Sequence, residues 1–237
     1  MKKLLGLVLV ISSFMLSAQS NSDLIKHFEA YYKQMKDQGD VQGIINGMTH
    51  LNVLEPSQAR IDTLAYIYMS EGQYIQALNT IGIEKVATDS EIAIEVKAIS
   101  LKAVKQPKLA IGFFEEMFKR EPDVFVAYEL AELNLQTQNL TEAEKHIKYG
   151  LENSKSDMKK AFYESQTPYE VPLKTAFMYL NALNIYNKDK KANIDAAVDI
   201  IDAALKTAPN FNIIQLTKTE LLRQKQVLLN QTQQPKN

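Results

Sequence analysis

The sequence predicts an all-α fold, a solenoid of about five helix-turn-helix units that ends in a capping helix. Composition is the first reason: of 237 residues, 46% are hydrophobic and 23% charged, while only 8 are glycine and 7 proline, which favours ordered helices. The second is the segment LAYIYMSEGQYIQALNTI, Leu64 to Ile81, where apolar residues recur three and four apart, break at Glu71 and Gly72, and then resume. The third is that this pattern returns every 33 residues. Helical pairs this short bury their apolar faces only by stacking.

The first element, residues 1–18, is MKKLLGLVLVISSFMLSA, which has the order of a secretory signal peptide. Lys2 and Lys3 precede an apolar run that is shorter than the roughly 20 residues of a membrane span. We therefore expect cleavage near Ala18, an exported protein that is periplasmic or secreted, and no stable membrane span afterwards. The chain has no cysteine, which excludes disulfides, thiolate metal sites and a lipid-modified cysteine.

The repeated array is expected over residues 24–210. Two alanine positions recur in it, because only a small side chain lets two antiparallel helices cross closely. The alanines are Ala65, Ala98 and Ala131 in one series and Ala77, Ala110, Ala143 and Ala197 in the other. The predicted units are about 25–57, 58–90, 91–123, 124–156 and 178–210.

Proline and hydroxyl residues predict several helix ends. Pro56, Pro122 and Pro209 fall where a helix should end or the next should begin, since a missing N–H costs little there. Thr141 followed by Glu144 has the spacing of a capping box, which predicts the start of the second helix of the fourth unit.

These patterns resemble the tetratricopeptide repeat (TPR), a helix-turn-helix unit with small and bulky residues at set positions. The positions that carry the resemblance are Ile61, Leu64, Ala65, Tyr68, Gly72, Tyr74, Ala77 and Ile81, with Ala110, Phe114, Met117 and Pro122 in the third unit. The resemblance implies a right-handed α-solenoid, here of an exported bacterial type. Lys97, Tyr32 and Asn134 depart from the consensus, which has Leu, a small residue and an aromatic residue there.

Three segments follow or interrupt the array. Residues 157–177 form an insertion with Pro168, Pro172, Tyr163 and Tyr169, which is either an irregular linker or short helix, or a recognition loop. Residues 211–229 predict an amphipathic capping helix over the end of the core. Residues 230–237 are polar and expected to be a disordered tail.

No catalytic, metal or cofactor site is expected. His27, His50 and His146 lack the spacing of a zinc helix and are expected to be solvated. We interpret the Glu115-Glu116 pair and the acids at 199 and 202 as solvent-exposed residues on helices. A catalytic pair would need two carboxylates facing each other across a cleft. The net charge of −1 gives no sign of a nucleic-acid partner.

The concave face is the candidate binding surface, because the resemblance implies that the first helix of each unit lines it. The partner-binding residues expected there are Asp62, Tyr66, Glu95, Ile99, Phe125, Tyr128 and Glu132. Aromatic anchors and carboxylates favour a protein or peptide segment with basic and apolar side chains. Alternatively, the aromatic residues Tyr66, Phe125 and Tyr128 pack within the array.

The sequence thus predicts a noncatalytic exported TPR scaffold for protein binding, in a bacterial cell-envelope assembly. The alternative is a small-ligand binder or enzyme built around the insertion at residues 157–177.

Overall fold

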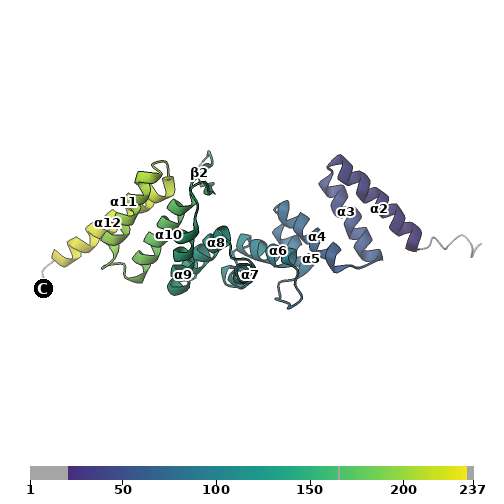
Figure 1. Ribbon diagram of the computed structural model, residues 1–237, viewed down its shortest axis with the longest axis horizontal. Helices are drawn as coiled ribbons and strands as arrows, with labels where there is room; N and C mark the ends of the chain where they lie inside the picture. The colour runs from purple at the N-terminus through teal and green to yellow at the C-terminus, as the bar shows by residue number, and fades with distance from the viewer. Residues whose placement is uncertain (1–20, 165, 234–237) are drawn as a thin grey trace, which may run out of the picture. The chain divides into compact units, whose positions relative to one another are not determined.

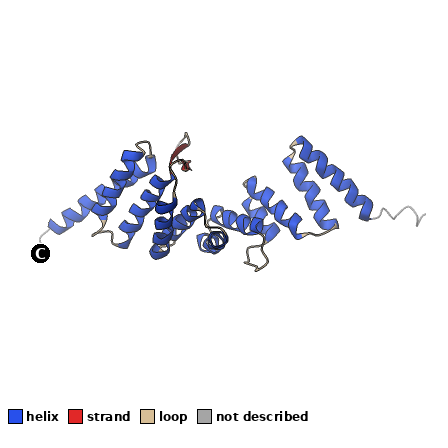
Figure 2. Ribbon diagram, viewed as in Figure 1, coloured by secondary structure: helices blue, strands red, loops and turns tan. Residues whose placement is uncertain are grey.

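The computed structural model describes residues 21–164 and 166–233, so the predicted signal peptide at residues 1–18 lies outside the described part. Within these residues the chain forms eleven α-helices and one two-stranded β-sheet, and the helices predominate (Figure 2). The chain divides into two compact units, Met1–Val104 and Lys105–Asn237.

Unit 1 consists of helices in antiparallel pairs (Figure 1). Its helices are α2 (Asn21–Gln38), α3 (Val41–Leu54), α4 (Gln58–Ser70), α5 (Tyr74–Ile81) and α6 (Glu91–Ala103). Helix α2 packs on α3, α3 on α4, and α4 on α5, while α6 contacts both α4 and α5. The predicted helix-turn-helix organisation is therefore present in this unit.

The corners within the pairs share one backbone conformation. Gly39, between α2 and α3, has φ 70°, and Gly72, between α4 and α5, has φ 72°. Glycine adopts this left-handed region without the steric cost that a Cβ brings. Lys105 (φ 60°) and Gln138 (φ 61°) have the same conformation at the next two 33-residue steps, although neither is glycine.

The recurring alanines lie where the helices cross. Ala65, Ala98 and Ala131 of the first series have no exposed surface. The same is true of the second series, Ala77, Ala110, Ala143 and Ala197. Close helix crossing therefore explains both series, as the sequence predicted.

Unit 2 also pairs its helices and encloses the larger core. Its helices are α7 (Pro107–Arg120), α8 (Val124–Gln136), α9 (Leu140–Asn153), α10 (Leu173–Lys188), α11 (Ile194–Thr207) and α12 (Asn212–Gln233). Successive helices pack together from α7 to α12, and α10 also contacts α8. Close approach of α9 to α10 depends on Gly150, because a Cβ there would lie 2.1 Å from Cζ of Phe177.

The insertion is a β-hairpin, which the sequence did not predict. Strand β1 (Lys159–Phe162) pairs antiparallel with β2 (Tyr169–Pro172), with Phe162 opposite Tyr169 and Lys159 opposite Pro172. Helix α10 starts directly after it, at Leu173, so the insertion is shorter than residues 157–177 and the fifth pair starts before 178. Pro172 caused this difference, since a proline suits both the end of a strand and the position before a helix.

Helix α12 covers the end of the unit 2 core, as predicted, but extends beyond residue 229. The helix continues through Gln233, because no glycine or proline interrupts it before Pro235. The predicted tail boundary at 230 is thus wrong, and residues 234–237 lie outside the described part. Phe211, Ile214 and Leu221 fix this end of the chain in the core.

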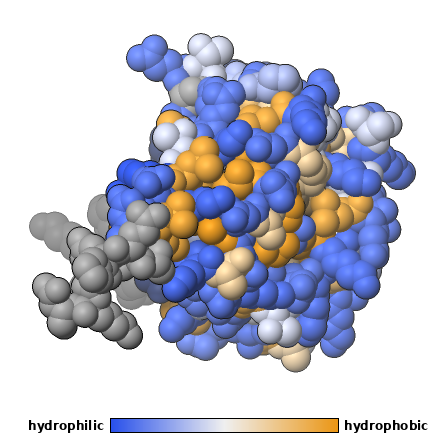
Figure 3. All heavy atoms as spheres, turned by 90° about the vertical axis from the view of Figure 1, so that its left-hand side faces the viewer, coloured by the Kyte–Doolittle hydropathy of each residue, from blue (hydrophilic) through white to orange (hydrophobic). Residues whose placement is uncertain are grey.

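Several apolar side chains of α12 are exposed at the C-terminal end of unit 2. Leu216, Leu222, Val227 and Leu229 of α12 are all more than 40% exposed. Figure 3 shows apolar residues gathered on this end, surrounded by hydrophilic ones. The seam between α11 and α12 is charged, since Lys218 pairs with Asp202 and Lys225 with Asp195, each at 2.5 Å.

Candidate binding site

A pocket of about 360 Å³ lies in unit 2, between α8, α10, β1 and the start of α12. Helix α8 contributes Tyr128, Glu132, Leu135 and Gln136 to its lining. Helix α10 contributes Tyr179, Leu180, Leu183 and Asn187, and the remaining two residues are Phe162 of β1 and Ile213 of α12. Two of the predicted partner-binding residues, Tyr128 and Glu132, are therefore brought together here.

Aromatic side chains form the rigid wall of this pocket. Phe162 lies 4.7 Å from the ring of Phe211, and Tyr179 lies 5.7 Å from the same ring. Tyr128 packs edge-on against Phe177 at 5.3 Å. Such offset and edge-on pairs add stabilisation beyond the area they bury, so these rings are held in place before any partner binds.

Tyr128 is a core residue with one edge in the pocket, since only 1% of its surface is exposed. This position agrees with the alternative in which Tyr128 packs within the array. Burial raises the pKa of its hydroxyl well above the usual value, and the nearby carboxylates of Glu132 and Glu129 raise it further. The hydroxyl therefore stays protonated at neutral pH.

A cation is held next to this wall by the hairpin. Lys160 of β1 lies 4.8 Å from the centre of the Tyr128 ring and forms an ion pair with Glu129 at 3.0 Å. This contact attaches β1 to α8 and leaves Phe162, two residues along the strand and on the same face as Lys160, against the pocket.

Tyr179 is oriented by α12. Its hydroxyl lies 3.3 Å from Oγ1 of Thr217, and burial raises its pKa although that hydrogen bond lowers it. Sequence reasoning missed Tyr179, Leu183 and Asn187 as pocket residues. These three residues are four apart, which indicates that they share a face of one helix. The predicted start of the fifth unit at residue 178 drew attention away from this pattern.

The third predicted residue of unit 2, Phe125, does not line the pocket. It lies on α8 one turn before Tyr128 and is 43% exposed. The carboxylate of Asp123 caps this end of α8 through the backbone N–H groups of Phe125 and Val126.

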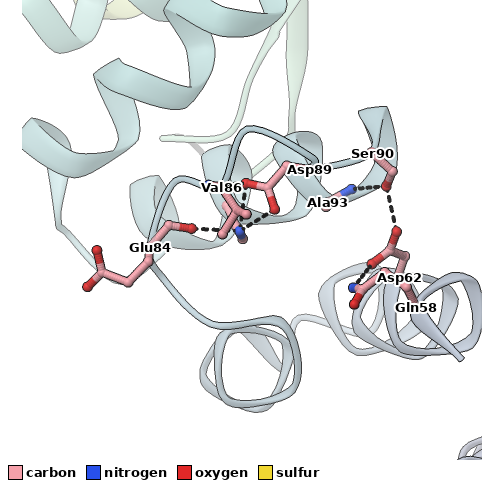
Figure 4. A network of polar contacts seen from close by, with 8 residues as sticks. Gln58, Asp62, Glu84, Val86, Asp89, Ser90 and Ala93 are labelled. Atoms are coloured by element: carbon pink, nitrogen blue, oxygen red, sulfur yellow. Dashed lines mark hydrogen bonds and ion pairs between the residues drawn. The ribbon is translucent and has the colours of Figure 1, made fainter. Parts of the chain in front are cut away.

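In unit 1, the four predicted residues have different environments. Asp62 is buried and accepts hydrogen bonds from Gln58 Nε2 at 2.7 Å and from Ser90 Oγ at 2.6 Å. Ser90 in turn caps α6, since its Oγ accepts from Ala93 N at 3.0 Å (Figure 4). Asp62 therefore links α4 to the start of α6.

The remaining three residues of unit 1 lie nearer to solvent. Tyr66 is 42% exposed and Glu95 is half-buried. Ile99 packs against the cluster of Ala65, Met69, Ala77 and Val96.

Lys97, one of the departures from the TPR consensus, is buried in unit 1. Its ammonium lies 2.8 Å from both carboxylate oxygens of Asp89 and donates to the carbonyl oxygen of Glu84 at 2.7 Å. Asp89 also accepts from the backbone N–H of Val86 at 3.0 Å (Figure 4). This network holds the segment between α5 and α6, where an ordinary repeat would have a tight turn.

One histidine differs from the expectation of solvation. His146 is only 5% exposed, with Nε2 2.9 Å from Oε1 of Glu115 and its ring edge-on to Phe118. It lies three residues after the buried Ala143 and four before the buried Gly150, so its helical position indicated burial. His50 is exposed, as expected, and stacks on Phe28 at 4.2 Å.

The described residues contain no group of three or more His, Cys, Asp or Glu arranged to hold a metal ion. Over the same ranges, no helix combines the length and apolar character needed to cross a membrane.

Comparison with known proteins identifies the fold. No protein-family model matches the chain, and no curated protein matches its sequence. A tetratricopeptide repeat protein from Parabacteroides merdae is similar in structure with a TM-score of 0.59 at 17% identity, over 83% of this chain and 72% of that one. YrrB, described as a TPR protein with an unusual peptide-binding site, has a TM-score of 0.62 at 12% identity, over 86% of this chain and 100% of that one.

Proposed function

Because the chain has the tetratricopeptide repeat fold, we propose that it is a noncatalytic exported scaffold that binds a segment of a partner protein. The pattern of residues 1–18 supports export, and a bacterial cell-envelope assembly is the setting that this pattern favours. The peptide-binding site of YrrB supports a role of this kind for the fold.

The observation that carries the proposal is the aromatic pocket of unit 2 with a carboxylate at its wall. Phe162 and Tyr179 supply rigid aromatic surfaces backed by the buried Tyr128, and Glu132 supplies negative charge beside them. Rigid aromatic surfaces bind apolar side chains at low entropic cost, while the carboxylate favours Lys or Arg. We therefore propose a partner segment with one apolar anchor and a neighbouring basic residue.

The volume of about 360 Å³ suits an anchor of this size. It is enough for one or two large side chains. Glu132 is the carboxylate among the lining residues, and Glu129 at the rim forms an ion pair with Lys160.

A library of displayed 12-residue peptides, selected on the immobilised mature chain (residues 19–237), tests this function. We expect enrichment of peptides that combine an aromatic or aliphatic residue with Lys or Arg. The variant Glu132→Gln should lose the enrichment of basic residues and keep that of apolar ones, because it removes charge and preserves shape.

Glu152→Gln is the matched control, since Glu152 is an exposed glutamate of α9 that does not line the pocket. It should select the same peptides as the native chain. Absence of any enriched motif on a chain with a helical circular dichroism spectrum would refute peptide binding.

The same pocket also favours one second candidate, a small-ligand binder built around the insertion. Its volume lies within the range of small-molecule sites, about 300–1,000 Å³, and Phe162 of the insertion lines it. A ligand of this class should raise the melting temperature of the native chain in a saturable manner, and Phe162→Ala should abolish that shift.

A further inference from the structure

A second pocket, of about 400 Å³, has walls from α10 and α12, both of which also contribute to the first pocket beside α8 and β1. Tyr186 of α10 and Gln224, Val227 and Leu228 of α12 form its walls, and basic residues, Lys190, Lys191 and Arg223, surround it. The first pocket carries a carboxylate, whereas this one carries three cations.

Both pockets follow one seam between α10 and α12. Tyr179, Leu183 and Tyr186 are spaced by four and three residues, so they share a face of α10. The hydroxyl of Tyr179 meets Thr217, and that of Tyr186 donates to Gln224, seven residues further along each helix. Seven residues of helix correspond to about 10 Å, which separates these two tyrosine contacts along α10 and α12.

Some of the polar groups around the second pocket are already hydrogen-bonded or ion-paired within the protein. Arg223 donates to Glu220 through Nε at 2.8 Å and Nη2 at 2.6 Å, and Gln224 donates to the same carboxylate at 2.8 Å. One cation is thus neutralised by Glu220.

The two lysines are not neutralised in this way. Lys190 and Lys191 are exposed, and within residues 21–164 and 166–233 neither ammonium forms an ion pair. The backbone N–H of Lys191 donates to Asp189, which orders the segment that carries both lysines. Net positive charge therefore remains at this end of the seam.

We propose that the second pocket binds an acidic residue of the same partner segment, so that the first pocket recognises a basic residue and the second an acidic one. This inference rests on the proposed function and adds the charge pattern of the segment. Tyr186 and Val227 then pack on the side chain next to the acidic one.

Peptide is favoured over an anionic membrane because the cations surround a concave pocket with apolar walls. A flat lipid surface is contacted best by cations that protrude from a flat or convex face.

The same displayed library, selected on the native chain and on Lys190→Gln/Lys191→Gln, tests the inference. The native chain should enrich Asp or Glu at a constant spacing from the basic residue, whereas the double variant should lose that enrichment and keep the basic and apolar residues. Lys145→Gln/Lys148→Gln, which removes the same charge from exposed positions of α9, is the control and should select like the native chain.

A selected peptide, synthesised with its acidic residue as Glu or Gln, gives the quantitative form of the test. Each change, in the protein or in the peptide, should weaken binding about two- to fivefold, since exposed ion pairs contribute little. The two changes together should weaken it no more than either alone, because both remove one contact.

The outcomes separate the two proposals. Enrichment of basic and apolar residues without acidic ones, or acidic enrichment that survives in Lys190→Gln/Lys191→Gln, overturns the second subsite and leaves the function standing. Absence of any motif overturns both. If the double variant loses binding to phosphatidylglycerol vesicles while its peptide selection is unchanged, the pocket belongs to a lipid surface and the inference is wrong.

Discussion

At the scale of single residues, the buried charges of unit 1 are compensated by named partners. Lys97 is 1% exposed at its side chain and Asp89 is 10% exposed, with 2.8 Å between the charged atoms. Removing one partner of a buried pair leaves an uncompensated charge, which costs more than the pair itself contributes.

Lys97→Met should therefore lower the free energy of unfolding by about 3 kcal/mol, because Asp89 loses its counter-ion. Urea denaturation measures this change. Lys97→Met/Asp89→Asn should cost less than the sum of the two single variants, and Lys33→Met, at an exposed site on α2, should change stability by less than about 0.5 kcal/mol. If Lys97→Met lowers the free energy of unfolding no more than the control Lys33→Met does, the ion pair does not stabilise the fold.

Buried tyrosines set the response of unit 2 to alkaline pH. Burial raises the pKa of Tyr128 and of Tyr179, so above pH 10 the unfolded chain releases protons that the folded chain retains. The free energy of unfolding then falls as the pH rises beyond 10, and it is unaffected by these groups below that pH.

Tyr128→Phe should weaken this loss of stability by up to about 1.4 kcal/mol per pH unit above pH 10, since phenylalanine has no proton to release. Urea denaturation at pH 9, 10 and 11 checks the slope. Tyr163→Phe, at a site that is 76% exposed, is the control and should retain the native slope. Identical slopes for both variants would contradict a buried, protonated Tyr128.

Some residues of the pocket could be found from the sequence and others could not. Tyr128 and Glu132 are separated by about one turn of α8, and the resemblance to the tetratricopeptide repeat placed both on the face that lines the array. Phe162 reaches the pocket only because β1 pairs with β2 and Lys160 meets Glu129, and such contacts between distant residues leave no periodic signal.

At the scale of elements, the three helix ends marked by proline lie where the sequence predicted them, whereas the helix start predicted from the capping box does not. Pro56, Pro122 and Pro209 each lie two residues after a helix ends, as predicted. The predicted capping box at Thr141 is wrong, because α9 already begins at Leu140 after the left-handed corner at Gln138. The left-handed backbone at Gln138 fixes where α9 starts. Sequence spacing did not show this corner, because Gln138 is not a glycine.

Lys105→Gly and Gln138→Gly should each stabilise the protein by about 0.5–1 kcal/mol. A residue with a Cβ is strained by about 1–2 kcal/mol in the left-handed region, and this relief exceeds the entropy that glycine loses on folding. Thermal unfolding measures both variants. Lys148→Gly, in the middle of α9, should instead cost about 1 kcal/mol, and a loss of stability at the two corners would refute the strain.

At the scale of the whole molecule, the largest hydrophobic cluster described for the chain lies within unit 2. Every residue of the large cluster around Phe177, Ile201 and Phe211 belongs to Lys105–Asn237. Unit 1 has its own, smaller clusters around Ala65 and around Ile45. The array predicted from the sequence as one series of repeats is thus divided into two units.

A fragment of residues 105–237 should therefore fold alone, because its largest hydrophobic cluster contains no residue of unit 1. Circular dichroism should show a helical spectrum and a cooperative thermal transition. A fragment of residues 137–237, which lacks α8 and therefore one wall of the core, is the control and should lose that cooperativity. A helical but non-cooperative 105–237 fragment would show that the core is not independent.

The turn of the hairpin offers a way to observe the pocket directly. Tyr163 is 76% exposed, follows Phe162 in the chain, and lies in a protein without a single cysteine. Tyr163→Cys therefore creates a unique thiol directly after a pocket residue in the chain, where an attached fluorophore would change its emission as the ring of Phe162 is covered. The antiparallel pairing of Phe162 with Tyr169 anchors the strand next to this reporter.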